Sequence, residues 1–478
     1  MAASDSDTDI QAAQRAGGQP AGPAKRAAAP SPAPKGKGEH PISPIAHDDA
    51  LSLTRRFETS AYNTFALSDE PPMLASGQGA CVYGEDGQRY LDLVCGSSVS
   101  NLGHDHPRQR AALHAAIDTG LYHVGTRLAA RARADLYREL AALFPAELDT
   151  VHLMTTGSDA IETAIKAARY VTGRHQVLGF HGSFHGRTLG TLALTSQRSA
   201  RAPFEPLDAG VHLLPYPYAL RPPLPGCDAT NITDACLDYL RRALKSPVSG
   251  LHHPAALVVE AIQGVGGVVK PADGFLEGLR AICTECDIVM VVDEVWNGFG
   301  RAGSWFAYEL DGIRPDLVTV SKGLSAGLPL SACIGTSSLL KAWPHGLQTG
   351  TWQGNVLACA LACETIRSYR DEGLIARVAD VIGPQLQRRL QVLHGQAHVA
   401  EVRVHGAQAA VELVEDRASL TPDVRRLKAV QRRCQERGVL TYSGGWYGNC
   451  LILLPPFVIG ADELDEALDI VIEAVTHR

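Results

Sequence analysis

Three positions in the sequence carry residue types that could do chemistry, and each comes directly after a short apolar run. The string TTGS at 155–158 follows TVHLM, Asp293 closes IVMVVD, and Lys322 closes DLVTVSK. In open α/β sheets, reactive groups gather in the loops beyond the carboxyl ends of the strands. The three positions are therefore expected to meet along one edge of a sheet.

The first position has the residues of a phosphate-binding turn. Gly157 permits a close backbone approach, and Ser158 with the first N–H groups of the following helix can hold a phosphate. The alternative is an ordinary turn in which Ser158 or Asp159 caps the helix.

Asp293 is expected at the end of a buried strand. An unpaired buried charge costs several kcal/mol, so this carboxylate needs a partner. A protonated pyridine nitrogen would serve, and the pair would keep the ring cationic, as an electron sink requires. The alternative partner is Arg301.

Lys322 is followed by GLSAGLP, and glycines allow close approach to a ligand. A lysine desolvated at such a position can form a Schiff base with a carbonyl group. The alternative is a surface lysine that extends from a strand end. The order of phosphate turn, acid and lysine along the chain favours a pyridoxal-phosphate site over the three alternatives, which are a helix cap, a salt bridge and a surface lysine.

The elements around these positions predict an α/β fold. Near-continuous apolar runs at 150–156, 176–180, 255–260, 288–294 and 316–321 alternate with helical patterns such as 158–172. This pattern is typical of a mixed, mostly parallel sheet covered on both faces. We predict a large domain over 107–346 and a smaller α+β domain over 347–478, joined by the segment 46–106, which turns at Asp86-Gly87 as a type I′ hairpin. Residues 1–45, rich in Ala and Pro, are predicted to be disordered.

Composition excludes several classes of protein. A net charge of −7 without a basic stripe gives no support to nucleic-acid binding. No apolar stretch reaches the roughly 18–20 residues of a membrane span, and the acidic N-terminus does not fit a signal peptide. Eleven scattered cysteines favour reduced thiols in the cytoplasm. The CxxC pair at 283 and 286 has no second pair with zinc spacing, so we expect it to be packing and predict no metal site.

The string VVDEVWNGFGRAGSWFAYELDGIRPDLVTVSKGLSAGLPLSA resembles the signature of class III pyridoxal-phosphate aminotransferases. Similar strings are YGEDGQRYLDL, NLGHDHP, TTGSDAIETAIKAARYVTGR, FHGSFHGRT, VVEAIQGVGG, TGTWQGN and LLPPFVI, in order from about residue 50 to the end. The resemblance implies the fold-type-I architecture, a homodimer with shared active sites, and pyridoxal 5′-phosphate as cofactor. It implies amino transfer between small-molecule amines and carbonyl compounds, through a Lys322 aldimine and a pyridoxamine intermediate.

The resemblance also implies roles for individual residues. Asp293 would hold the ring nitrogen, and Lys322 would carry the cofactor and shuttle the proton. The remaining cofactor contacts would come from Gly157, Ser158, Phe184, Val295 and, from the neighbouring subunit, Thr351. Arg187 matches a position that some relatives use for a substrate carboxylate, and it could equally be structural. Glu260 lies near the cofactor in the family, whereas His185 and His104 are expected to hold loops.

Three departures from the family pattern concern the substrate. Trp296 replaces a Gln near the cofactor, Val265 replaces a Glu, and Ile452 replaces an Arg. In relatives this Glu and Arg resemble a gate that admits α-carboxylates. The loss of both residues together avoids leaving one buried charge without its partner. The alternatives are a local slip of the alignment or another arginine in the same role. We predict an amine or amino-sugar substrate, as in aminoglycoside antibiotic biosynthesis.

Two other functions remain open. The racemase and epimerase branch of the family also lacks the gate, and LLPYPYALRPP resembles it. Epimerisation would need a second acid–base group, for which Cys95 and Tyr83 are the candidates. A non-catalytic cofactor-binding protein is the other alternative, which the retention of Lys322, Asp293, Ser158 and Thr351 disfavours.

Overall fold

The structure is a computed structural model that describes residues 49–477. The predicted tail, residues 1–45, lies outside the described residues. The chain divides into two units, residues 1–57 and 58–478, and helix α1 (Ala50–Phe57) belongs to the first. Between residues 49 and 477, no helix combines the length and apolar character that crossing a bilayer needs.

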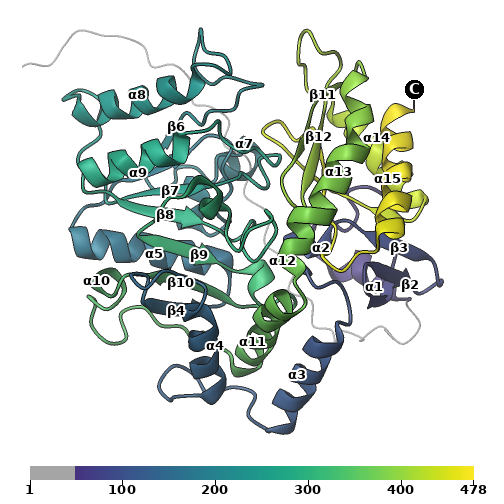
Figure 1. Cartoon of the computed structure of the whole chain (residues 1–478), viewed down its shortest axis with the longest axis horizontal. Coiled ribbons are helices and arrows are strands. Elements are labelled where there is room, and N and C mark those ends of the chain that lie inside the picture. The colour runs from purple at the N-terminus through teal and green to yellow at the C-terminus, as the bar shows by residue number, and fades with distance from the viewer. Residues whose placement is uncertain (1–48, 478) are drawn as a thin grey trace, which may run out of the picture. The chain divides into compact units, whose positions relative to one another are not determined.

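A seven-stranded sheet, ordered β4-β10-β9-β8-β7-β5-β6, holds the predicted strands of the second unit (Figure 1). Strand β10 is antiparallel to both of its neighbours, and the other pairs are parallel. The carboxyl ends of six strands therefore meet at one edge, and the predicted mixed, mostly parallel sheet is confirmed. The strands are β4 (Thr150–Met154), β5 (Val177–Phe180), β6 (Val211–Leu214), β7 (Ala256–Glu260), β8 (Val289–Asp293), β9 (Leu317–Val320) and β10 (Ser331–Gly335).

Helices cover this sheet because its central strands are apolar on both faces. Every residue of β7, β8 and β9 is buried. Helix α5 (Gly157–Thr172) packs against five of the strands and ends at Gly173, whose φ of 66° is the left-handed conformation expected of a glycine stop. The other helices of this part are α6 (Leu189–Leu194), α7 (Arg198–Arg201), α8 (Ile232–Lys245), α9 (Phe275–Glu285) and α10 (Ser337–Leu340).

Two four-stranded sheets form the rest of the β-structure, ordered β1-β2-β3-β13 and β11-β12-β15-β14. The short strand β13 pairs in parallel with β3, so a C-terminal segment completes the N-terminal sheet. The strands are β1 (Leu74–Gln78), β2 (Cys81–Gly84), β3 (Arg89–Asp92), β11 (Val399–Val404), β12 (Ala409–Leu413), β13 (Val439–Leu440), β14 (Tyr442–Gly444) and β15 (Cys450–Leu453). The accompanying helices are α12 (Leu374–Arg377), α13 (Gly383–Leu390), α14 (Val424–Glu436) and α15 (Ala461–Thr476).

The predicted hairpin at Asp86-Gly87 is present, but its predicted turn type is wrong. A type I′ turn needs positive φ at both central residues, and only Gly87 has it, at 80°. The Gly87 N–H donates to the Gly84 carbonyl at 3.0 Å, and the Asp86 carboxylate accepts the Gln88 N–H at 3.0 Å. The turn is therefore longer than the predicted two-residue turn, and the Asp86 side chain stabilises it.

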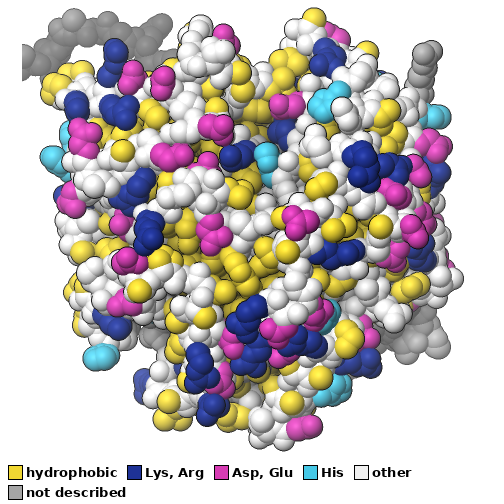
Figure 2. Space-filling model, viewed as in Figure 1, with side chains coloured by type: hydrophobic (Ala, Val, Ile, Leu, Met, Phe, Trp, Pro, Cys, Tyr) yellow, Lys and Arg dark blue, Asp and Glu magenta, His cyan; other side chains and the backbone are white. Residues whose placement is uncertain are grey.

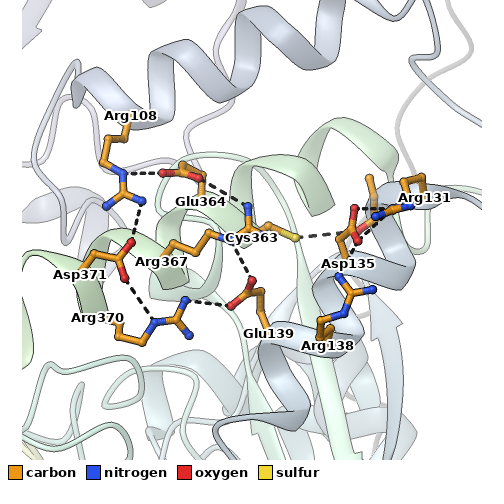
Figure 3. A network of polar contacts seen from close by, with 11 residues as sticks. Arg108, Arg131, Asp135, Arg138, Glu139, Cys363, Glu364, Arg367, Arg370 and Asp371 are labelled. Atoms are coloured by element: carbon orange, nitrogen blue, oxygen red, sulfur yellow. Dashed lines mark hydrogen bonds and ion pairs between the residues drawn. The ribbon is translucent and has the colours of Figure 1, made fainter.

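Ion pairs join helices α3 (Pro107–Asp118), α4 (Arg131–Ala141) and α11 (Val356–Asp371), as Figure 3 shows. Glu139 accepts hydrogen bonds from Arg367 at 2.7 Å and from Arg370 at 3.2 Å. Arg108 on α3 reaches Asp371 on α11 at 3.0 Å. On the face seen in Figure 2, basic and acidic side chains are interspersed in the same way over the surface.

Candidate active site

A cavity of about 180 Å³ lies beyond the carboxyl ends of β4, β7, β8 and β9. It brings together eight of the ten predicted site residues: Gly157, Ser158, Phe184, Glu260, Asp293, Val295, Trp296 and Lys322. A larger hollow, of about 680 Å³, lies along 65–73 and β2–β3 and contains none of them. The predicted edge of the sheet is therefore where the chemistry-bearing residues meet.

The first turn of α5 forms the anion-binding end of the cavity. Thr156 caps the helix, because its hydroxyl accepts the Asp159 N–H at 3.2 Å while the Asp159 carboxylate accepts the Thr156 N–H at 3.0 Å. The alternative that Ser158 or Asp159 is the cap is therefore wrong. The first N–H groups of a helix have no intrahelical acceptor, so those of Gly157 and Ser158 can bind an anion.

Glycines bring the walls of this end close together. A Cβ at Gly157 would lie 2.8 Å from a methyl group of Val295. Gly186 has a φ of 135°, and a Cβ there would lie 2.2 Å from the Ser158 hydroxyl. Any other residue at either position would enter the space beside the helix N-terminus.

Asp293 ends β8 with 4% of its surface exposed. One carboxylate oxygen lies 2.7 Å from Nδ1 of His185, and the other accepts the Val295 N–H at 2.9 Å. Burial disfavours a charged His185, but its hydrogen bond to Asp293 and the charges of Asp293 and Glu260 outweigh burial and raise the pKa of the imidazole. Sequence reasoning assigned His185 to loop support, and only its position beside Phe184 hinted at the contact.

Arg301 is not the partner of Asp293. The guanidinium is fully buried and donates instead to Ser98 Oγ at 3.1 Å and to the carbonyls of Ala407 and Pro455 at 2.6 and 2.7 Å. The predicted alternative of an Asp293–Arg301 salt bridge is therefore wrong, and Asp293 lines the cavity.

Glu260 ties two loops of the cavity wall together. Its carboxylate accepts the Phe184 N–H at 2.9 Å and the Gly264 N–H at 3.0 Å. Burial raises the pKa of this carboxyl to about 7, although the neighbouring His185 acts in the opposite direction. The hydrogen bond from its backbone N–H to Glu260 thereby holds Phe184 in place, and the residue lines the cavity.

Lys322 has the electrostatics of a lysine that can lose its proton near neutral pH. Its side chain keeps some exposure to the cavity, but protein surrounds the amine. This desolvation lowers the pKa of Lys322 to about 8, while Asp293 and Glu260 act to raise it. The residue also has a φ of 34°, an unusual conformation for a lysine and one typical of functional sites.

Two predicted residues do not line the cavity. Thr351 is exposed in the segment before α11, and within one chain it does not reach the site. Arg187 is exposed, and its guanidinium lies 5.6 Å from the centre of the Phe184 ring. Arg187 therefore lies beside Phe184 at the outside of the cavity.

Val265 and Ile452, the positions where the family resemblance implies a charged gate in relatives, both lie beside Gly444. A Cβ at Gly444 would be 2.5 Å from the Val265 carbonyl oxygen and 2.7 Å from Cδ1 of Ile452. Val265 lines the cavity, and Ile452 on β15 is fully buried. The sequence positions assigned to Glu and Arg in relatives are thus neighbours here, which argues against a slipped alignment.

A left-handed turn supports the same wall. Cys95, Gly96, Ser97 and Ser98 have φ between 49° and 69°, although three of the four carry a Cβ. The Asp92 carboxylate holds this turn by accepting the N–H groups of Val94 and Cys95, and its other oxygen pairs with His104 at 2.9 Å. Sequence reasoning missed the turn, because nothing in CGSS predicts consecutive left-handed residues.

The two candidates for a second acid–base group are not at the cavity. Neither Cys95 nor Tyr83 is among its lining residues. Burial raises the pKa of the Cys95 thiol to about 12, so it stays protonated. The described residues therefore supply one amine base, Lys322, within the cavity.

The lining fits a flat, cationic heteroaromatic ring that carries a phosphate. The N-terminus of α5 suits the phosphate, Phe184 and Val295 offer apolar surface to the ring, and Asp293 provides a buried carboxylate beside an amine. The fold and this site together define a fold-type-I enzyme that uses pyridoxal phosphate.

Comparison with known proteins gives the family. The class-III aminotransferase model matches residues 66–475. The diaminobutyrate–2-oxoglutarate aminotransferase of Rhizobium meliloti is 34% identical over 407 residues, 83% of this chain and 86% of the relative. The acetylornithine aminotransferase of Methanopyrus kandleri is 34% identical over 420 residues, 88% of this chain and 97% of the relative.

A solved structure of an amine transaminase from an uncultivated Pseudomonas species, in its PLP-bound form, superposes with a TM-score of 0.80. It is 28% identical and covers 92% of this chain and 98% of its own. The chain belongs to the class-III aminotransferase family, and it is a pyridoxal-phosphate-dependent aminotransferase of small-molecule amines and carbonyl compounds.

Proposed function

We propose that this aminotransferase takes its amino group from an amine or amino sugar rather than from an α-amino acid. The observation that supports the proposal is the apolar pair Val265 and Ile452, which lie beside Gly444 at the positions where the family resemblance implies a charged gate. Val265, the member of this pair that lines the cavity, offers an α-carboxylate no charge in exchange for its lost hydration.

The cofactor would be held by residues of the cavity. The N–H groups of Gly157 and Ser158 would bind its phosphate, and Phe184 and Val295 would contact the two faces of its ring. Asp293 would pair with the ring nitrogen, with His185 keeping the carboxylate oriented. When bound, pyridoxal phosphate accepts into its ring the electron pair released at the substrate carbon.

Lys322 would hold the cofactor and then carry the proton. Its amine, with a pKa lowered to about 8, would take the proton from the substrate carbon and deliver it to the cofactor's C4′. Glu260 would keep Phe184 in place during this transfer. The protein thereby positions one base beside one carbon and excludes bulk water.

A cationic, carboxylate-free substrate fits the charges of the cavity. Glu260 and Asp293 are its carboxyl groups, and Lys322 is its amine. An aminoglycoside-type amino sugar in antibiotic biosynthesis has this chemistry, and such a substrate would leave Arg187 outside the reaction. Epimerisation gains no support from the two candidates for a second acid–base group, because neither Cys95 nor Tyr83 lines the described cavity.

We also propose a cytoplasmic homodimer that completes the site. Thr351 would reach the phosphate of the partner subunit, as the family resemblance implies. Exposed apolar side chains lie before α4 and around Thr351: Leu121, Tyr122, Leu128, Leu347 and Trp352. A second copy of the chain would cover such a surface.

The test compares amino donors in the absence of an acceptor. The purified enzyme is mixed with an amino sugar, an unsubstituted amine, or glutamate, and the rate at which the absorption of the lysine-bound cofactor disappears is measured. Faster conversion by the amino sugar or amine than by glutamate supports the proposal. Faster conversion by glutamate would contradict it. Lys322→Ala, with unchanged circular dichroism, should convert none of them.

A further inference from the structure

The indole of Trp296 forms the wall next to the Lys322 amine. The Lys322 Nζ lies 4.1 Å from the centre of the indole ring. Trp296 has 4% of its surface exposed, and its ring stands against Gly264, where a Cβ would be 2.3 Å from the indole Cγ. Tyr442 packs on the indole, with ring centres 5.7 Å apart. The amine therefore lies over a ring that cannot move away from it.

A chain of hydrogen bonds fixes the orientation of this ring. The indole N–H donates to Gln408 at 2.9 Å, the Gln408 amide donates to Asn297 at 3.0 Å, and the Asn297 amide donates to the Ile262 carbonyl at 2.6 Å. The Trp296 carbonyl accepts from Ser98, in the left-handed turn. Because its only donor is used by Gln408, the indole presents to the cavity its π-face and no polar atom.

Among the aromatic side chains, the indole of Trp attracts cations to its face most strongly. An ammonium within about 6 Å of its centre is stabilised, whereas a neutral amine gains little. We propose that Trp296 is a positioning residue that holds the unbonded amine of Lys322 as an ammonium ion against its indole face. This inference rests on the proposed role of Lys322 as the proton carrier.

Such a contact has a use during turnover. After Lys322 has taken up a proton, its ammonium must remain beside the substrate until it gives the proton up again. The indole face holds the charged amine without a hydrogen bond that would compete for the proton. Asp293 and Glu260 attract the same charge, and Arg301 repels it. His185, paired with Asp293, completes the charged groups around the amine.

The test measures the protonation of Lys322 in the full-length chain freed of cofactor. The protein is exposed briefly to an amine-acylating reagent at a series of pH values, and mass spectrometry gives the extent of acylation of the peptide that contains Lys322. Only the neutral amine reacts, so the midpoint of the profile reports its pKa. Removing the indole with Trp296→Leu should lower this midpoint by about 0.5–1.5 pH units, because the ammonium loses its partner.

Two further variants keep the result interpretable. Trp296→Phe retains an aromatic face and should lower the midpoint less than Trp296→Leu does. Trp343→Phe removes an indole that contacts His152 instead, and it should leave the midpoint unchanged. A midpoint that is the same in wild type, Trp296→Phe and Trp296→Leu would overturn the proposal, as would a rise. Full turnover by Lys322→Ala would instead refute the proposed function, which separates the two failures.

Discussion

Introducing Glu in place of Val265 and Arg in place of Ile452 should destabilise each single variant, and should destabilise the double variant by less than the sum of the two single effects. Ile452→Arg puts a guanidinium at a fully buried position now held by an apolar side chain. An uncompensated buried charge costs about 3–5 kcal/mol. Val265→Glu, at the cavity wall, should cost about 1–3 kcal/mol.

The two charges should attract each other in the double variant. The Val265 backbone and the Ile452 side chain both lie beside Gly444, so a Glu and an Arg at these positions are expected to reach each other. Neighbouring residues couple by about 0.5–3 kcal/mol, and a close ion pair lies at the upper end. The double variant should therefore be more stable than the sum of the single effects by about 2 kcal/mol.

The assay is urea unfolding of wild type, both single variants and the double variant, followed by kinetics with glutamate. The KM of the double variant for glutamate should be at least about tenfold lower than that of wild type. A tenfold change is about 1.4 kcal/mol, which is the contribution expected of one modest ion pair between the new Arg and the substrate carboxylate. Val265→Glu combined with Ile452→Met is the control, because Met cannot pair. Strictly additive effects of the two charges would refute the neighbour relation, and an unchanged KM would refute the link to carboxylate recognition.

Three other outcomes follow from the contacts. Asp293→Asn should reduce kcat by about 100-fold or more, because an amide cannot keep the cofactor ring cationic. It should cost little stability, because the amide can still contact His185. Steady-state kinetics measure the first effect and thermal unfolding measures the second. Gly186→Ala should weaken cofactor binding about tenfold or more, read by equilibrium dialysis, since its Cβ meets Ser158. Glu139→Gln should lower the free energy of unfolding by about 1 kcal/mol in low salt and by less in 1 M NaCl, because it removes the ion pairs with Arg367 and Arg370. Glu466→Gln, which removes an exposed ion pair with Arg89, should have a smaller effect.

The fold was predictable where the sequence pattern depends on local chemistry. The strands that end at Glu260 and Asp293 are apolar on both faces, and this pattern requires a covered, mostly parallel sheet. Because carboxyl ends of parallel strands share an edge, the meeting of Asp293 with Lys322 followed from the pattern as well. The family resemblance then supplied Phe184 and Val295, which no periodicity would have found.

Other features depend on contacts between distant segments, and no local pattern encodes them. The partner of Asp293 is His185, which is 108 residues away, whereas Arg301 satisfies its donors with loops near 98, 407 and 455. The hold of Gln408 on the Trp296 indole spans 112 residues. Such pairings form only when the three sheets and their loops are assembled. The sequence therefore predicted the reactive residues better than the residues that hydrogen-bond to them and hold them in position.

Above all, Lys322 is expected to bond the cofactor. The most direct measurement is borohydride reduction of the purified holoenzyme, followed by digestion and mass spectrometry, with Lys322→Ala treated in parallel. We expect the mass of reduced pyridoxal phosphate on the peptide that contains Lys322, and we expect it to be absent from the variant. Modification of another lysine, with the Lys322 peptide unchanged, would contradict the account.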